Sequence, residues 1–103
     1  MKLITKAIAK SLPALGSTDG LGDAAVARVK FFSPVGSWSW YGVEYSPEDG
    51  TFFGLVFGHE TELGYFSLSE LESVKLPFGL GIERDLHFSP TTLGDIKKKA
   101  GVV

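Results

Sequence analysis

The residues best suited to acid–base or metal chemistry lie in two short polar segments. One is His59-Glu60-Thr61-Glu62, and the other is Glu83-Arg84-Asp85 followed by His87. Together they hold both histidines of the chain among four carboxylates. Imidazole and carboxylate groups can bind a divalent metal ion, and paired carboxylates can share general acid–base work. This chemistry would be that of a metal-dependent hydrolase or nuclease, with the ligands His59, Glu60, Glu62 and Asp85.

The metal site requires that the two segments meet in the fold. If residues 59–62 are extended, Glu60 and Glu62 point to the same side of the chain and can meet one cation. Asp85 joins them only if its strand is a neighbour. The spacing of a zinc protease is absent. The alternative is structural: an acidic loop that forms salt bridges with Arg84.

A second candidate site combines cations with aromatic rings around residues 28–40. Aromatic platforms with nearby basic groups bind single-stranded nucleic acid by base stacking and phosphate contact. The alternative is that the tryptophans belong to the core and the basic stems lie over them. The candidate binding residues are Arg28, Lys30, Trp38 and Trp40.

Several function classes are excluded by what the chain lacks. It contains no cysteine, which excludes disulfides, thiolate zinc sites and a cysteine nucleophile, and suits a reducing cytoplasm. No phosphate-binding glycine loop or nucleophile elbow is present, so no cofactor is expected. No apolar run approaches the ~20 residues of a membrane helix. Lys6 and Lys10 interrupt the signal-like N-terminus, so we expect a cytoplasmic protein without membrane association.

Charge is unevenly distributed along the chain. The net charge is −2, so bulk electrostatics do not favour nucleic-acid binding. Between Glu44 and Asp85 there are nine acids and two bases, whereas the rest of the chain has eight bases and three acids. The middle of the chain is therefore acidic and its two ends are basic.

The pattern of apolar residues, caps and turns predicts a single α+β domain over residues 1–103. The expected architecture is a mostly antiparallel sheet of about five strands with three helices, in the order α-β-β-β-β-α-β-α. Helices are expected at 6–12 after Thr5, at 68–74 after a capping box at Ser67, and after residues 89–92. Strands are expected at 25–32, 37–45, 51–57, 63–66 and 82–88. The glycine-rich segment 16–24 is a loop without an assigned role.

Turn chemistry sets the expected strand registers. A turn at Ser33–Ser37 would pair Lys30 with Trp40, and one at Pro47–Gly50 would pair Ser46 with Thr51 and Tyr41 with Val56. Both faces of this meander are then largely apolar. An antiparallel sheet open to water would alternate, so both faces need cover from helices or from a second subunit. A homodimer is one way to supply it.

Nearly the whole chain resembles a small family of uncharacterised domains of about a hundred residues. The resemblance is carried by Val29-Lys30-Phe31-Phe32-Ser33-Pro34, Gly36-Ser37-Trp38-Ser39-Trp40-Tyr41, Phe52-Phe53-Gly54-Leu55-Val56, Gly58-His59-Glu60-Thr61-Glu62-Leu63-Gly64-Tyr65-Phe66 and Pro77-Phe78-Gly79-Leu80-Gly81-Ile82-Glu83-Arg84-Asp85. Members occur on bacterial plasmids, integrated phages and other mobile elements, and the resemblance implies that context. It implies no activity and no functional residues.

The sequence therefore favours a small non-enzymatic binding or adaptor protein that engages a protein partner or nucleic acid. The competing hypothesis is the metal-dependent hydrolase, and the meeting of Asp85 with residues 59–62 discriminates between the two.

Overall fold

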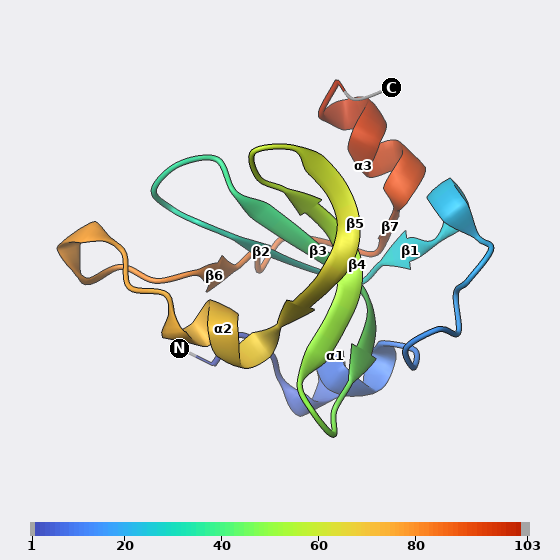
Figure 1. Ribbon diagram of the computed structural model, residues 1–103, viewed down its shortest axis with the longest axis horizontal. Coiled ribbons are helices and arrows are strands. Elements are labelled where there is room, and N and C mark those ends of the chain that lie inside the picture. Colours follow the sequence, from blue (N-terminus) through green and yellow to red (C-terminus); the bar gives the residue numbers. More distant parts are fainter. Residues whose placement is uncertain (1, 102–103) are drawn as a thin grey trace.

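The computed structural model describes residues 2–101 (Figure 1). Its helices are α1 (Lys6–Ser11), α2 (Leu68–Ser73) and α3 (Leu93–Lys99), with 3₁₀ turns η1 (Gly22–Ala24) and η2 (Pro77–Gly79). Its strands are β1 (Val26–Ala27), β2 (Val29–Phe32), β3 (Ser39–Ser46), β4 (Thr51–Phe57), β5 (Thr61–Ser67), β6 (Glu83–Arg84) and β7 (Thr91–Thr92). The predicted α+β class is confirmed. Residues 1, 102 and 103 of the predicted domain lie outside the described residues. Over residues 2–101, every helix is too short or too polar to cross a membrane.

Each helix begins at a hydroxyl side chain that accepts a backbone hydrogen bond. Thr5 Oγ1 accepts from the N–H of Ile8 (3.1 Å), and Ser67 Oγ accepts from Glu70 (3.3 Å). Thr92 Oγ1 accepts from Asp95 (3.2 Å). Such caps satisfy N–H groups that the first helical turn leaves unpaired. The helix starts predicted at Thr5 and Ser67 are confirmed.

The main sheet has five antiparallel strands in the order β5-β4-β3-β2-β6, and a separate sheet joins β1 to β7. The β3–β4 turn is the predicted one: Ser46 pairs with Thr51, and Gly50 has a positive φ of 71°. The N–H of Gly50 donates to the carbonyl of Ser46 at 2.8 Å. Proline and glycine at fixed positions in this turn set the hairpin.

On the N-terminal side of Glu44 the predicted register of β3 against β4 is wrong by one residue. The register shifts between Gly42 and Glu44, so Tyr41 faces Leu55 rather than Val56. Val43 is the extra residue of a β-bulge, which turns both Val43 and Glu44 toward one face of the sheet. The shift also aligns three glycines across neighbouring strands, Gly42, Gly54 and Gly64.

The predicted register of β2 against β3 is also wrong by one residue. Lys30 lies opposite Tyr41, not Trp40, and Phe31 takes the place opposite Trp40. The Ser33 side chain explains the difference, because its Oγ accepts from the N–H of Val35 (3.3 Å). This local turn lengthens the loop, and the N–H of Ser33 bonds to the carbonyl of Trp38.

Two predicted strands are interrupted or shortened. The strand expected at 25–32 breaks at Arg28, whose N–H donates to the carbonyl of Gly42 (2.9 Å) next to the bulge. Residues before the break leave the main sheet and pair with β7. The strand expected at 82–88 retains only β6, which pairs with Phe31 and Phe32.

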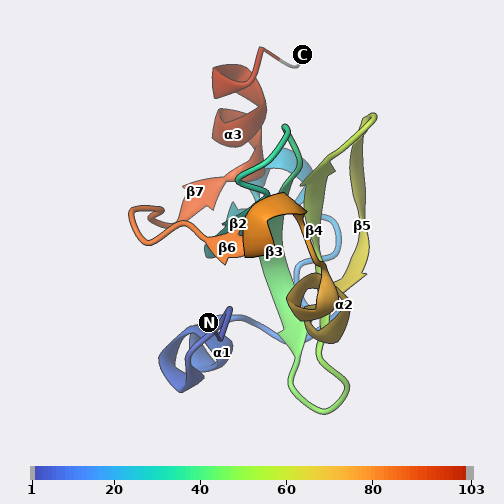
Figure 2. The same cartoon turned by 90° about the vertical axis from the view of Figure 1, so that its left-hand side faces the viewer.

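Each face of the main sheet carries its own core. Helices α1 and α2 cover one face around Phe31 and Phe52, while α3 and β1 cover the other around Val43 and Leu55. Figures 1 and 2 show α3 at one end of the molecule and the two other helices at the opposite end. The chain's own helices thus supply the predicted cover over the cores on both faces.

Phe78 occupies a backbone conformation that favours glycine. It has φ 64° and ψ 24° within η2, and its side chain is 94% exposed. A left-handed conformation costs a residue with a Cβ about 1–2 kcal/mol. We expect Phe78→Gly to raise the free energy of unfolding by roughly 0.5–1 kcal/mol, net of the glycine entropy cost, in urea denaturation. Phe78→Ala keeps the strain and should change little; a loss of stability in the glycine variant would contradict the argument.

Candidate functional site

The structure does not bring the predicted metal ligands together. His59 and Glu60 lie in the β4–β5 turn and Glu62 lies in β5, whereas Asp85 follows β6. Strands β5 and β6 are the two opposite edges of the sheet. Over residues 2–101, no three histidine, aspartate or glutamate side chains are grouped so as to hold a metal ion. The competing metal-site hypothesis required Asp85 to meet residues 59–62, and the structure does not bring them together, because three strands separate them.

The individual side chains have other neighbours. The His59 ring meets Trp38 edge-on, with ring centres 5.3 Å apart. Asp85 Oδ1 accepts from the N–H of His87 at 2.9 Å. Arg84 Nη1 donates to the carbonyl of Leu3 at 2.7 Å, so this guanidinium ties the N-terminal segment to β6.

The predicted basic–aromatic platform is divided between the two faces of the sheet. Lys30 lies with Tyr41 on the face that α3 covers, whereas Trp40 packs with Phe31 on the other. Trp38 remains beside Trp40, with ring centres 5.8 Å apart, and Arg28 is exposed at the break between β1 and β2. The one-residue register difference causes this division.

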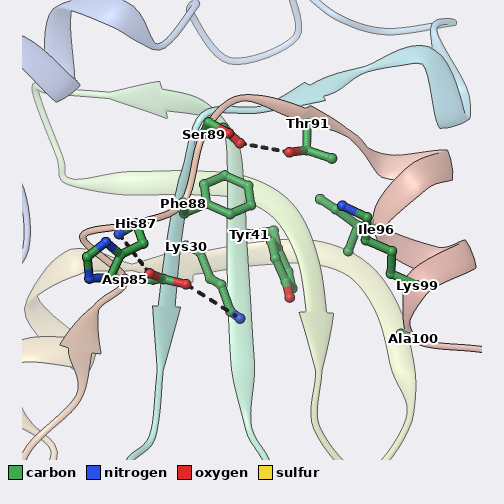
Figure 3. A pocket seen from close by; sticks show the side chains of 10 residues that line it. All are labelled: Lys30, Tyr41, Asp85, His87, Phe88, Ser89, Thr91, Ile96, Lys99 and Ala100. Atoms are coloured by element: carbon green, nitrogen blue, oxygen red, sulfur yellow. Dashed lines mark hydrogen bonds and ion pairs between the residues drawn. The ribbon is translucent and has the colours of Figure 1, made fainter.

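A cleft lies between β2, β3 and α3, and we call it the Lys30 cleft (Figure 3). Its volume is about 410 Å³. Strands β2 and β3 contribute one side chain each, and the rest come from residues 85–91 and from α3 with the residue that follows it. Its charged, aromatic and hydroxyl-bearing lining includes Lys30, Tyr41, Asp85, Phe88, Ser89 and Lys99.

The Lys30 cleft joins cationic and aromatic groups. Lys30 Nζ lies 5.5 Å from the centre of the Tyr41 ring and 3.8 Å from Asp85 Oδ2. The Tyr41 ring packs against Phe88 with centres 5.7 Å apart. On α3, Lys97 is held by Asp23 at 2.8 Å, whereas Lys99 lines the cleft.

The second candidate surface is the outer edge of β5, which we call the β5 edge (Thr61–Ser67). Gly58 donates to the carbonyl of Glu60, and Leu68 donates to the carbonyl of Gly50. These bonds fix the alternation of the β4–β5 ladder, so even-numbered residues of β5 direct their backbone groups to β4. The odd-numbered residues Thr61, Leu63, Tyr65 and Ser67 direct theirs outward.

The β5 edge is apolar and open. Leu63 is 49% exposed and Tyr65 is 70% exposed, and the strand contains no proline or lysine. Within residues 2–101, no strand pairs with its outer side. Natural proteins usually protect such edges with charges, prolines or covering segments. An exposed edge of seven residues, with Glu62 as its single charged side chain, indicates a surface that pairs with another extended chain.

A hollow of about 220 Å³ adjoins this edge, and we call it the Trp38 hollow. Its lining includes Trp38, Val56, His59, Glu62 and Gly64. A Cβ on Gly58 would lie 2.4 Å from the Trp38 ring, so this ring occupies the space above a glycine. A Cβ on Gly64 would meet no atom within 4 Å, so the space above Gly64 is open.

Sequence reasoning missed the open edge and the Lys30 cleft for different reasons. The open edge was missed because the strand expected at 82–88 could have paired with either edge of the meander, and in the structure β6 pairs with β2. The cleft has no local signal. It depends on where α3 docks, far along the chain from Lys30 and Tyr41.

Comparisons with known proteins point to a family without an assigned function. A family model described as "Protein of unknown function (DUF2958)" matches residues 3–100. No curated protein matches the chain, and no solved structure matches it.

Proposed function

The chain belongs to the DUF2958 family, whose function is unknown, and we propose that it is a non-enzymatic adaptor that captures an extended, basic segment of a partner protein. The segment adds a strand to the main sheet at the β5 edge. The observation that carries the proposal is the outward row of backbone groups on Thr61, Leu63 and Tyr65, beside exposed apolar side chains. We further propose that the protein acts in the bacterial cytoplasm, because it contains no cysteine, and that it is encoded on a mobile element, because of the sequence resemblance.

Strand addition would supply affinity through main-chain hydrogen bonds and selectivity through side-chain positions. Glu62 and Gly64 lie on the same face of β5, two residues apart. A basic residue opposite Glu62 would form a cross-strand ion pair. A large apolar residue opposite Gly64 would enter the Trp38 hollow. The preferred segment therefore has a lysine or arginine two residues from a large apolar side chain.

The charge around the edge favours a basic partner over a second copy of this chain. Residues 59–74 include Glu60, Glu62, Glu70 and Glu72 and no lysine or arginine. Two such edges side by side would bring like charges together, which is unfavourable. The chain's own helices cover the cores on both faces of the sheet, whereas Leu63 and Tyr65 of β5 stay exposed and are available to the partner segment.

The test selects randomised ten-residue peptides displayed on phage against the purified protein. We expect the enriched peptides to carry a basic and a large apolar residue at positions i and i+2. Synthetic copies should bind in fluorescence anisotropy and shift the NMR signals of residues 61–67 and the Trp38 indole. Binding should weaken as salt rises, because part of the recognition is electrostatic.

Leu63→Pro is the discriminating variant, and Leu63→Ala is its control. Proline removes the outward N–H of Leu63 while leaving the ladder with β4 intact, since that N–H points to solvent. We expect at least a tenfold loss of peptide affinity for proline and a smaller loss for alanine, with circular dichroism unchanged. Peptides that bind the proline variant equally well, or that lack the basic–apolar pattern, would refute the proposal. A concentration-dependent dimer in sedimentation, abolished by Leu63→Pro, would assign the edge to a second copy instead.

A further inference from the structure

The Lys30 cleft is a separate concave surface that strand addition at β5 does not use. It is bounded by β2, β3 and α3, whereas the β5 edge is the outer side of the strand at one end of the sheet. Its volume of about 410 Å³ lies within the range of about 300–1,000 Å³ typical of small-molecule sites. A lone inorganic anion would leave most of that space empty.

Positive charge exceeds negative charge in this cleft. Two lysines, Lys30 and Lys99, and one carboxylate, that of Asp85, line it. The Lys30–Asp85 pair is loose at 3.8 Å, and Asp85 is also engaged by the N–H of His87. Among residues 2–101, the ammonium of Lys30 has the loose ion pair with Asp85 and donates no hydrogen bond, so its N–H donors can turn to a ligand. A ligand with negative charge is therefore favoured.

Aromatic and hydroxyl groups define the rest of the ligand. In Figure 3 the Tyr41 side chain extends between Lys30 and α3, and its hydroxyl points the same way as Lys30 Nζ. These two groups can donate together to one phosphate. The Lys99 ammonium is directed toward Ile96 in Figure 3, and it joins the same phosphate by a change of side-chain rotamer. Phe88 gives the cleft an aromatic wall, and the Ser89 hydroxyl lies at its rim. Phosphate beside an aromatic wall is the chemistry that recognises a nucleotide.

We propose that the Lys30 cleft binds a nucleoside monophosphate unit, with the phosphate at Lys30, Tyr41 and Lys99 and the base against Phe88. The unit is either a free nucleotide or one nucleotide of a single strand, since both present the same phosphate and base. Lys99 thereby acquires a role besides the favourable interaction of a C-terminal lysine with the dipole of α3.

The experiment titrates the protein with dTMP and AMP, using thymidine and inorganic phosphate as the two half-ligands and hexathymidylate as the strand. We expect both monophosphates to bind in calorimetry and to shift NMR signals of residues 30, 41, 88 and 99. Thymidine and phosphate should each bind at least tenfold more weakly. Tighter binding of hexathymidylate than of dTMP would assign the unit to a strand, and equal affinity would assign it to a free nucleotide.

The matched variants are Lys30→Met, Lys99→Met and Lys98→Met. Methionine keeps much of the apolar stem and removes the charge. We expect the first two to weaken dTMP binding at least tenfold and Lys98→Met to leave it unchanged, because Lys98 does not line the cleft. If Lys30→Met unfolds because Asp85 loses its ion-pair partner, Lys99→Met still tests whether the lysines of the cleft bind the phosphate. No binding of either monophosphate at millimolar concentration, or unchanged binding by Lys99→Met, would overturn the proposal.

Discussion

Gly54→Ala is expected to lower the free energy of unfolding by about 3 kcal/mol or more, which lowers the melting temperature by roughly 15 °C. A Cβ at this position would lie 1.8 Å from the carbonyl oxygen of Tyr41 and 3.2 Å from the Cα of Gly42. Both obstacles are backbone atoms of β3, so no change of rotamer relieves the clash. Strands β3 and β4 would have to separate at the middle of the sheet.

Gly64→Ala is the matched control, because Gly64 pairs with Gly54 in the same row of the sheet. A Cβ there meets no atom within 4 Å. Since glycine in a strand costs about 0.5–1 kcal/mol relative to alanine, Gly64→Ala should leave stability unchanged or raise it slightly. Thermal melting, monitored by circular dichroism, compares the stabilities of the two variants. If Gly54→Ala melts within a few degrees of the unchanged protein, β3 and β4 do not approach as closely as the structure has them.

Features that depend on a few neighbouring residues were predictable from the sequence. The caps at Thr5 and Ser67 and the turn at Pro47–Gly50 are confirmed. Each is determined by hydroxyl, proline or glycine chemistry within about four positions. These local signals were enough to obtain the fold class.

The predicted strand registers were wrong where the structure has one extra residue in a strand or in a loop. The bulge at Val43 and the longer loop after Ser33 each shift the pairing by one position. Alternation alone carries no information on such an insertion, because both faces of this sheet are apolar and either register buries apolar side chains. Glycines inside β3 and β4 were the available signal, since glycine within a strand often marks a bulge or a close backbone approach.

The register shift between β2 and β3, together with the strand order, determines which candidate residues lie close to one another. The shift in β2 removes Lys30 from the tryptophans and places it with Tyr41, where α3 completes a cleft. The proposed metal site failed at a larger scale, because strand order separates Asp85 from Glu62. Strand order in a sheet is set by tertiary packing, which the spacing of acids in a sequence does not encode.

The bulge has a further consequence at Glu44. It turns this glutamate to the face away from Phe52, where it is only 2% exposed. Its carboxylate accepts from the N–H of Gly16 (2.7 Å), the N–H of Thr18 (2.8 Å) and the Thr18 hydroxyl. The sequence alone assigned no role to the loop at residues 16–24. In the structure, one buried carboxylate holds this loop against the sheet.

Burial alone would raise the pKa of Glu44, but the hydrogen bonds from Thr18 and Gly16 outweigh it and hold this pKa below the ordinary value of 4.5. A carboxylate with a lowered pKa in the folded state stabilises the fold above its unfolded pKa. That contribution is lost as the pH falls from about 4.5 through the folded pKa. The hydrogen-bonded loop should therefore loosen in acid.

Glu44→Ala is expected to lower the free energy of unfolding at pH 7 by about 3 kcal/mol, because three donors lose a charged acceptor. The exposed Glu48, in the β3–β4 turn, is the control, and Glu48→Ala should change stability by less than about 0.5 kcal/mol. Urea denaturation between pH 3 and 7 measures both. The stability difference between the unchanged protein and Glu44→Ala should shrink below pH 4.5, because protonation removes the same interaction. A difference that stays constant with pH would mean that Glu44 contributes through packing rather than through its charge.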